Sequence, residues 1–117
     1  MSSSYGTPQL NVVNAVRIDI HDTDYSIQPL DYLISIVAPL TAQRKMTLPD
    51  ATVDIPIGKM YIIKDESYSA DANNILVVGF GTPGSEQPID GLTPGAVINS
   101  KGGSLTLVSN GVSWYIV

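Results

Sequence analysis

A glycine-rich segment is the part of the sequence with the most familiar chemistry. Residues 79–84 read G-x-G-x-x-G and follow the apolar run Ile75–Val78, as a dinucleotide-binding loop follows its strand. Such a loop needs a helix directly after it, because the amides at the helix N-terminus bind the pyrophosphate. Pro88 and Pro94 prevent a helix of useful length, and no acidic residue stands about 20 positions further on to bind the ribose. We therefore predict a loop between strands and no nucleotide cofactor.

A second cluster combines carboxylates with the single histidine of the chain. Asp19, His21, Asp22 and Asp24 lie close together in the sequence, and Ca²⁺ is bound by clustered carboxylates and loop carbonyls. The cluster lacks the glycine and the terminal glutamate of an EF-hand loop. A solvated turn between two strands is the favoured interpretation. A calcium site at residues 19–24 stays open as the alternative.

Other catalytic arrangements find little support in the residue types. With one histidine and no cysteine, a nucleophile and base could only be a serine and His21, and no G-x-S-x-G elbow places the serine. No carboxylate pair stands out for glycoside cleavage. Trp114 could be a platform for stacking a sugar, but its place in a β run favours a core position. We therefore predict no catalytic residues, metal or cofactor.

The composition favours a protein whose surface is partly covered by other subunits. The 117 residues suffice for one domain. Hydrophobic residues make up 44% and charged residues only 15% of the chain, whereas about a quarter is charged in an average soluble domain. Part of the exposed apolar surface is therefore expected to lie between subunits. The net charge of −5 and the scattered basic residues argue against nucleic-acid binding.

The start of the chain predicts neither a secretory signal nor a membrane anchor. It contains no charged first region and no long apolar run, and the longest apolar runs elsewhere are far too short to cross a bilayer. Residues 1–11 are rich in serine and carry little to bury, which predicts an arm that becomes ordered only against a partner. Tyr5 and Leu10 are its candidate docking residues. Residues 12–117 are expected to form a single domain.

Short β-rich runs separated by turn signals predict an all-β fold. Residues 12–20 alternate as one strand. Residues 32–37 are apolar on both faces, which suits a strand covered on both sides or lying at a subunit contact, so Tyr32, Ile34 and Ile36 are candidate interface residues. Further strands are expected at residues 44–48, 59–64, 74–79, 96–99, 104–109 and 112–117.

The clearest local signal is a hairpin at the end of the sequence. Asn110-Gly111 favours the type I′ turn of a two-residue hairpin loop. That register pairs Leu107 with Trp114 and Leu105 with Ile116. All four side chains then share one face of the hairpin, which we predict to be the core face.

Several short pieces follow one another in a recognisable order. They are T-L-P-D-A at 47–51, G-K-M-Y-I-I-K-D at 58–65, A-N-N-I at 72–75, I-D-G at 89–91, I-N at 98–99 and the closing G-S-L-T-L-V-S-N-G-V-S-W-Y-I at 103–116. Within these pieces, Asn73-Asn74 and Asp90-Gly91 tolerate the left-handed backbone that a tight turn requires. From about residue 32 onward, the chain resembles a domain of phage tail-fibre, tailspike and head-fibre proteins.

The resemblance implies a homotrimeric, antiparallel β-sandwich or jelly-roll-like knob on a phage particle. An arm as short as residues 1–11 spans at most about 40 Å, which would hold the knob close to its support. We therefore expect a capsid decoration (cement) protein on the outer surface of the virion, assembled in the host cytoplasm. It would bind the major capsid protein at three-fold positions and stabilise the shell by mass action. The alternative is a knob on a tail or fibre protein that recognises a host glycan.

Overall fold

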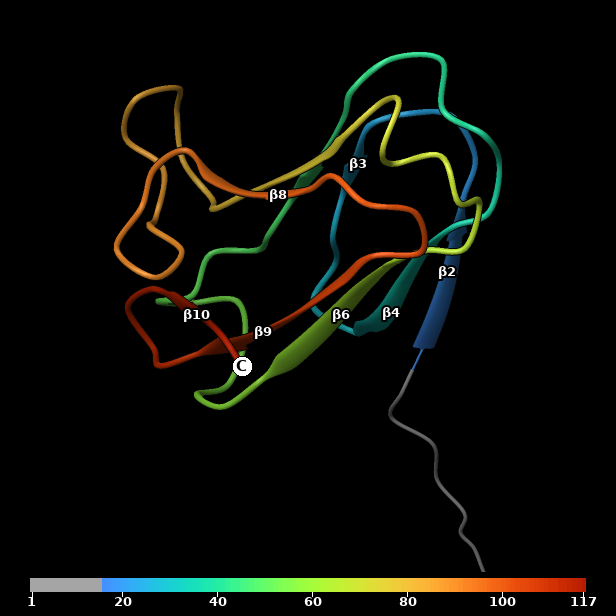
Figure 1. Ribbon diagram of the computed structural model, residues 1–117. Helices are drawn as coiled ribbons and strands as arrows, with labels where there is room; N and C mark the ends of the chain where they lie inside the picture. Colours follow the sequence, from blue (N-terminus) through green and yellow to red (C-terminus); the bar gives the residue numbers. More distant parts are fainter. Residues whose placement is uncertain (1–15) are drawn as a thin grey trace, which may run out of the picture.

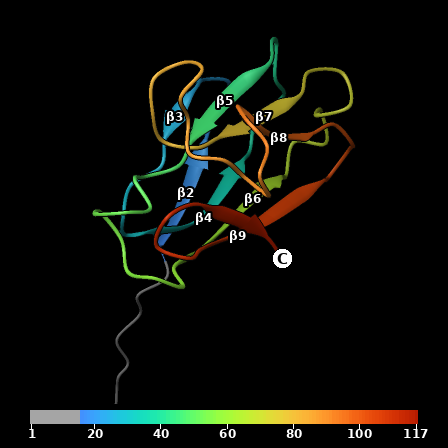
Figure 2. The same cartoon turned by 90° about the vertical axis from the view of Figure 1, so that its left-hand side faces the viewer.

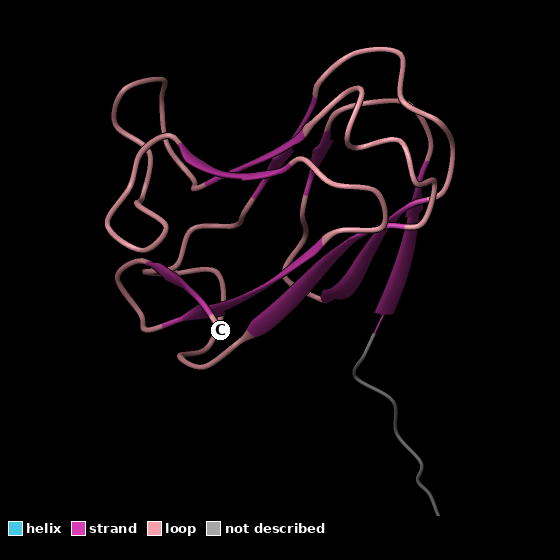
Figure 3. Cartoon of the chain, viewed as in Figure 1, coloured by secondary structure: helices cyan, strands magenta, loops and turns pink. Residues whose placement is uncertain are grey.

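The computed structural model describes residues 16–117, and these contain strands, turns and loops but no helix (Figure 3). The prediction of an all-β fold is therefore confirmed. The strands are β2 (Val16–Ile20), β3 (Tyr25–Ser26), β4 (Asp31–Ile36), β5 (Arg44–Thr47), β6 (Met60–Asp65), β7 (Ile75–Val78), β8 (Gly95–Ile98), β9 (Ser104–Ser109) and β10 (Trp114–Ile116).

The strands form two sheets that lie in separate layers (Figure 2). Sheet 1 has the order β10-β9-β6-β4-β2, and sheet 2 has the order β3-β5-β7-β8. From β2 to β7 the chain alternates between the sheets, so β2, β4 and β6 pair in parallel in sheet 1. In the same way β3, β5 and β7 pair in parallel in sheet 2. From β2 to β7 the chain therefore winds around the core and adds one strand to each sheet per turn, and we call this part the coil.

The coil ends where the chain turns back on itself. Strand β8 pairs antiparallel with β7, β9 pairs antiparallel with β6, and β10 completes sheet 1 as the antiparallel neighbour of β9. Both sheets are thus mixed, and the prediction of a purely antiparallel architecture is wrong. The physical reason is that side-chain alternation has the same period in both kinds of ladder and carries no information on strand direction.

A single hydrophobic core lies between the two sheets. Sheet 1 contributes Ile34 and Ile63, which are partners across the parallel ladder of β4 and β6, and both are fully buried. Sheet 2 contributes Met46 and Val77, which are partners across β5 and β7 and are also fully buried. Alternate residues of these strands point inward. The other core residues are Ile20, Ile27, Ile36, Leu40, Leu48, Ala51, Tyr61, Ala70, Ile75, Ile89, Ile98, Leu107 and Trp114.

The core corrects one assignment made from the sequence. Ile34 and Ile36 are fully buried by residues of their own chain, so their side chains are not free to contact a second copy. Tyr32, the third residue of that predicted interface, is half-buried. The apolar character of residues 32–37 reflects the position of β4 as an inner strand of sheet 1, between β2 and β6.

The final hairpin keeps its predicted alternation of faces but not its predicted register, and Ile116, which was predicted to be core, is 37% exposed. Trp114 pairs with Ser109 and Ile116 with Leu107, so the loop is longer than Asn110-Gly111 alone. The Asn110 side-chain oxygen accepts hydrogen bonds of 3.0 and 2.9 Å from two backbone amides inside this loop, which stabilises the wider turn. Because the register shifts by an even number of residues, Trp114 still shares the face of Leu107.

The predicted turn residues divide into two groups. Gly111 has a φ of 91°, and Asp90-Gly91 has φ values of 50° and 75°, so these turns use the left-handed backbone as expected. Asn73-Asn74 does not adopt positive φ, and that prediction is wrong. The Asn73 side-chain amide instead donates a 2.8 Å hydrogen bond to the carbonyl of Leu40 and joins two loops.

One edge of sheet 1 is covered by a turn of the same chain. Beside β10, the amide of Trp114 donates to the Pro88 carbonyl, and the Asp90 amide donates back to the Trp114 carbonyl. The Asp90 side chain then accepts a 3.0 Å hydrogen bond from the amide of Ile116. The opposite edge is β2, which has no neighbour on its outer side among residues 16–117 (Figure 1).

Trp114 is fully buried, as predicted, and its ring packs against Tyr61 with centroids 5.7 Å apart and planes inclined by 50°. We predict that Trp114→Ala lowers the free energy of unfolding by about 3–5 kcal/mol, because it empties a large core volume. Urea denaturation measures this loss. The control is Phe80→Ala, at an aromatic side chain that is 46% exposed, with an expected change below about 1 kcal/mol. Equal losses would contradict the core role of Trp114.

Candidate functional site

The carboxylates of residues 19–24 point to separate partners. Asp22 accepts hydrogen bonds from the Arg44 guanidinium at 2.8 Å and the Thr41 hydroxyl at 2.6 Å, and these partners hold the pKa of Asp22 well below its ordinary value. Asp24 accepts a 2.8 Å bond from a backbone amide of β5, and Asp19 pairs with the arginine two positions before it. Within residues 16–117, no three histidine, cysteine or acidic side chains gather closely enough to hold a metal.

The glycine-rich segment is a loop, as predicted, and no helix follows it. Gly79 is required by close contact: a Cβ there would lie 1.8 Å from the carbonyl oxygen of Gln87. The Gln87 amide donates a 2.8 Å hydrogen bond to the Phe80 carbonyl, which joins the two sides of this loop. The glycine therefore permits two backbone segments to approach each other.

The fully buried carboxylate of Asp65 joins three segments of the chain. It accepts hydrogen bonds from the Ser67 hydroxyl at 2.6 Å, the Ala70 amide at 2.9 Å and the Gly102 amide at 3.3 Å. Burial raises the pKa of this carboxyl group, but the hydrogen bonds outweigh burial, and the pKa of Asp65 lies below its ordinary value. An ionised carboxylate with its oxygens engaged in this way is a structural group and a poor proton donor.

A second buried carboxylate, Asp31, holds the turn between β3 and β4. It accepts a 2.6 Å hydrogen bond from the Tyr25 hydroxyl and a 2.8 Å bond from the Gln28 amide. Burial, together with the bond to Asp31, raises the pKa of Tyr25 to about 12. The Tyr61 hydroxyl donates to backbone carbonyls of the same turn at 3.2 Å. The acidic and phenolic groups at this end of the core are therefore engaged in structural contacts.

We predict that Asp65→Asn lowers the free energy of unfolding at pH 7 by about 1–3 kcal/mol, because the new amide faces backbone donors that need an acceptor. The pKa of Asp65 is lowered in the folded chain. Its stabilising contribution is therefore complete above the ordinary carboxyl pKa of about 3.9 and is lost as the pH falls through the lowered value.

The measurement is urea denaturation of both proteins at pH 7 and at a pH well below 3.9. The difference between wild type and Asp65→Asn should be smaller at the acidic pH. Asp71→Asn, at an exposed loop position, is the control and should resemble wild type at both pH values. A difference for Asp65→Asn that does not change with pH would refute the ionised state assigned to Asp65.

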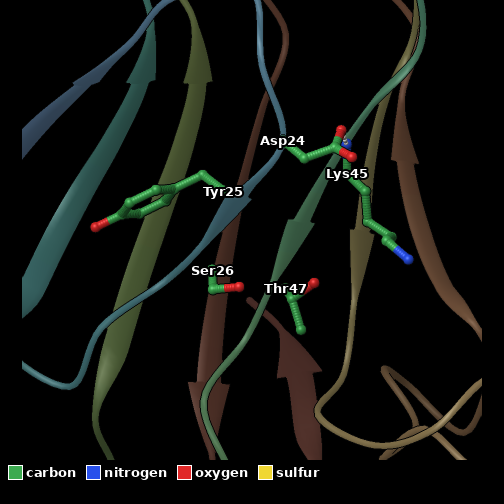
Figure 4. Close-up of a pocket in the computed structure, with 5 residues that line it drawn as sticks. All are labelled: Asp24, Tyr25, Ser26, Lys45 and Thr47. Atoms are coloured by element: carbon green, nitrogen blue, oxygen red, sulfur yellow. Dashed lines mark hydrogen bonds between the residues drawn. The ribbon is translucent and has the colours of Figure 1, made fainter.

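One open groove of about 370 Å³ lies beside β3 and β5 and is lined by Asp24, Tyr25, Ser26, Lys45 and Thr47. Figure 4 shows Asp24 next to Lys45, while the Tyr25 ring points away from both. The hydroxyl groups of Ser26 and Thr47 complete a polar lining. These groups can donate and accept hydrogen bonds, as a small polar ligand such as a sugar requires. The groove offers that ligand no aromatic platform, because the Tyr25 ring packs against the hydrophobic core.

The second candidate site is the part of the outer face of sheet 1 that is mainly apolar. In β6, Tyr61 and Ile63 are buried inward, so Met60, Ile62 and Lys64 point outward. The strand register aligns these residues with outward-facing neighbours on β4, β9 and β10. We define the sheet-1 face as Leu33, Met60, Ile62, Thr106, Val108 and Tyr115. Met60 and Tyr115 are 37% and 43% exposed.

Ionic groups border the sheet-1 face on the side of β2. Arg17 donates to Glu66 at 2.7 and 2.9 Å and to Asp19 at 2.7 Å. Since Arg17 lies on β2 and Glu66 follows β6, this ion pair reaches across β4, where the small side chain of Ser35 is fully buried. These contacts raise the pKa of Arg17 and lower that of Glu66.

Exposed apolar residues continue around the β10 end of sheet 1. Val112, in the loop before β10, and Val117, after it, are both strongly exposed. Ile57 is also exposed and lies beside the same loop, since a Cβ on Gly111 would come within 2.9 Å of its side chain. We define Ile57, Val112 and Val117 as the β10 end. The sequence carried a signal for this surface, because the outward positions of β6 and β9 include the apolar residues Met60, Ile62 and Val108.

The remaining predicted residues lie elsewhere. Trp114 belongs to the core and offers no exposed sugar platform. Tyr5 and Leu10 lie outside the described residues. No helix in residues 16–117 is long and apolar enough to cross a membrane. In comparisons with known proteins, the chain matches no family model and no curated protein.

Proposed function

We propose that this chain is a non-enzymatic structural protein of a phage particle and that it acts by binding other proteins. The apolar sheet-1 face and the adjoining β10 end are the observation that supports this proposal. A contiguous apolar patch that is bordered by ionic groups often marks a contact with another protein. The buried carboxylates Asp31 and Asp65 accept hydrogen bonds that hold the fold together, so they are unsuited to catalysis.

The specific form of the proposal is a homotrimeric capsid decoration protein that binds the major capsid protein at three-fold positions of the shell. The resemblance of residues 32–117 to phage knob domains supports the phage particle as its location. The low charged fraction of 15% supports assembly with other subunits. Binding only to the assembled shell would stabilise that shell in proportion to RT ln(1 + [L]/Kd).

The groove beside β3 and β5 supports a second candidate function, a tail- or fibre-bound knob that recognises a host glycan. Its lining combines a carboxylate, an ammonium group and two hydroxyls, which suit a polyhydroxylated ligand. The two candidates differ in copy number, since decoration requires many copies per particle and a tail knob only a few. Decoration is the better supported of the two, because the groove lacks an available aromatic platform.

We predict that deleting residues 1–11 leaves a folded protein whose binding to undecorated phage shells falls by at least about 100-fold, because several arms on one oligomer act together. Co-sedimentation of full-length and truncated protein with undecorated shells measures this. The double variant Tyr5→Ala/Leu10→Ala tests the two side chains without shortening the chain. Equal binding by the truncated protein would contradict docking through the arm. Absence of binding by the full-length protein would instead favour the glycan-binding alternative.

A further inference from the structure

We infer that copies of this chain meet through the sheet-1 face, with three copies turning this face toward a common axis. The inference rests on the homotrimer of the proposed function and assigns its contact surface. It replaces the interface expected at Tyr32, Ile34 and Ile36, because the two isoleucines are fully buried in the single chain.

The arrangement of apolar residues supports this contact. Ile62 lies on the middle strand of sheet 1 and is flanked in register by Leu33 on β4 and Thr106 on β9. A second row aligns Met60 with Val108 and Val108 with Tyr115. The two rows form one uncharged area, and it extends to β10 at the edge of the sheet. Such an area loses unfavourable contact with water when an apolar surface covers it.

The charges of this face suit a partner with the same sequence. The whole chain carries a formal net charge of −5, so two copies repel each other on average. Around the sheet-1 face, Arg17 and Lys64 balance Asp19 and Glu66, two positive against two negative groups. Arg17 is paired with both acids. The excess negative charge therefore lies elsewhere on the chain, and like faces can approach without net repulsion.

The size of the surface indicates how far the contact extends. The six residues of the sheet-1 face form two rows of three, and each covers about 4.8 Å by about 6.8 Å of the sheet, which gives a face of about 200 Å². A stable interface buries about 800 Å² on each partner, so the sheet-1 face supplies about a quarter of that. The β10 end, with Ile57, Val112 and Val117 exposed, continues the apolar surface and provides further contact area.

The test compares two valine substitutions at outward-facing strand positions. Val108→Glu places a charge in the sheet-1 face, and Val97→Glu places the same charge on β8 of sheet 2, where Val97 is 43% exposed. Light scattering at micromolar concentration should give wild type and Val97→Glu a mass of three times 12.5 kDa. Val108→Glu should show a threefold lower mass with an unchanged circular dichroism spectrum. A trimeric Val108→Glu protein, including one that has lost only shell binding, would overturn the inference.

A second measurement decides the matter if Val108→Glu fails to fold. The chain contains no cysteine, so Thr106→Cys introduces a single thiol into the sheet-1 face. Under mild oxidation, Thr106→Cys should form covalent dimers and Val97→Cys should not. Trimers that show no Thr106→Cys cross-link, or equal cross-linking of both variants, would refute the sheet-1 contact while leaving the proposed trimer intact. A monomeric wild-type protein would refute the trimer itself and this inference with it.

Discussion

Ile34 and Ile63 lie side by side across the parallel ladder of β4 and β6, and Met46 and Val77 do the same across β5 and β7 in the opposite sheet. These pairs face one another across a single core. Each time the chain crosses from one sheet to the other, it must return with an inward side chain in register with the previous strand. A slip of one residue would turn that strand's apolar side chains outward, so the coil depends on these matched rows.

Parallel pairing brings a second requirement, because it needs long connections whose backbone groups must find partners. In this chain, carboxylate side chains accept hydrogen bonds from such backbone groups. Asp65 accepts from the amides of Ala70 and Gly102, Asp31 accepts from the amide of Gln28, and Asp24 from a backbone amide of β5. Asp24, which belongs to the cluster considered as a calcium site in the sequence, is therefore one of the residues that fasten a loop to a strand.

Strand positions and the burial of Trp114 could be predicted from the sequence. Strand positions follow from the alternation of neighbouring side chains, and the burial of Trp114 follows from the size of its side chain and its place in a strand. Strand direction in the coil could not be predicted, since parallel and antiparallel ladders share one side-chain period. Strand β3 was missed because Tyr25–Ser26 is too short to show alternation. The hairpin register was wrong because the Asn110 side chain stabilises a wider loop. The sheet-1 face was overlooked because only residues 32–37 were interpreted as apolar on both faces, so the subunit contact was assigned to Tyr32, Ile34 and Ile36.

The two edges of sheet 1 differ in whether a further strand can pair with them. At β10, the main-chain groups of Trp114 and the amide of Ile116 are hydrogen-bonded to the turn that contains Pro88 and Asp90. These groups are therefore not available to pair with a strand from another chain. At β2, no described strand occupies the outer side. Any segment that joins the sheet by main-chain pairing must therefore do so beside β2, where the coil begins. Continuous edge-to-edge growth of sheet 1 from one copy to the next is blocked, because it would need two open edges.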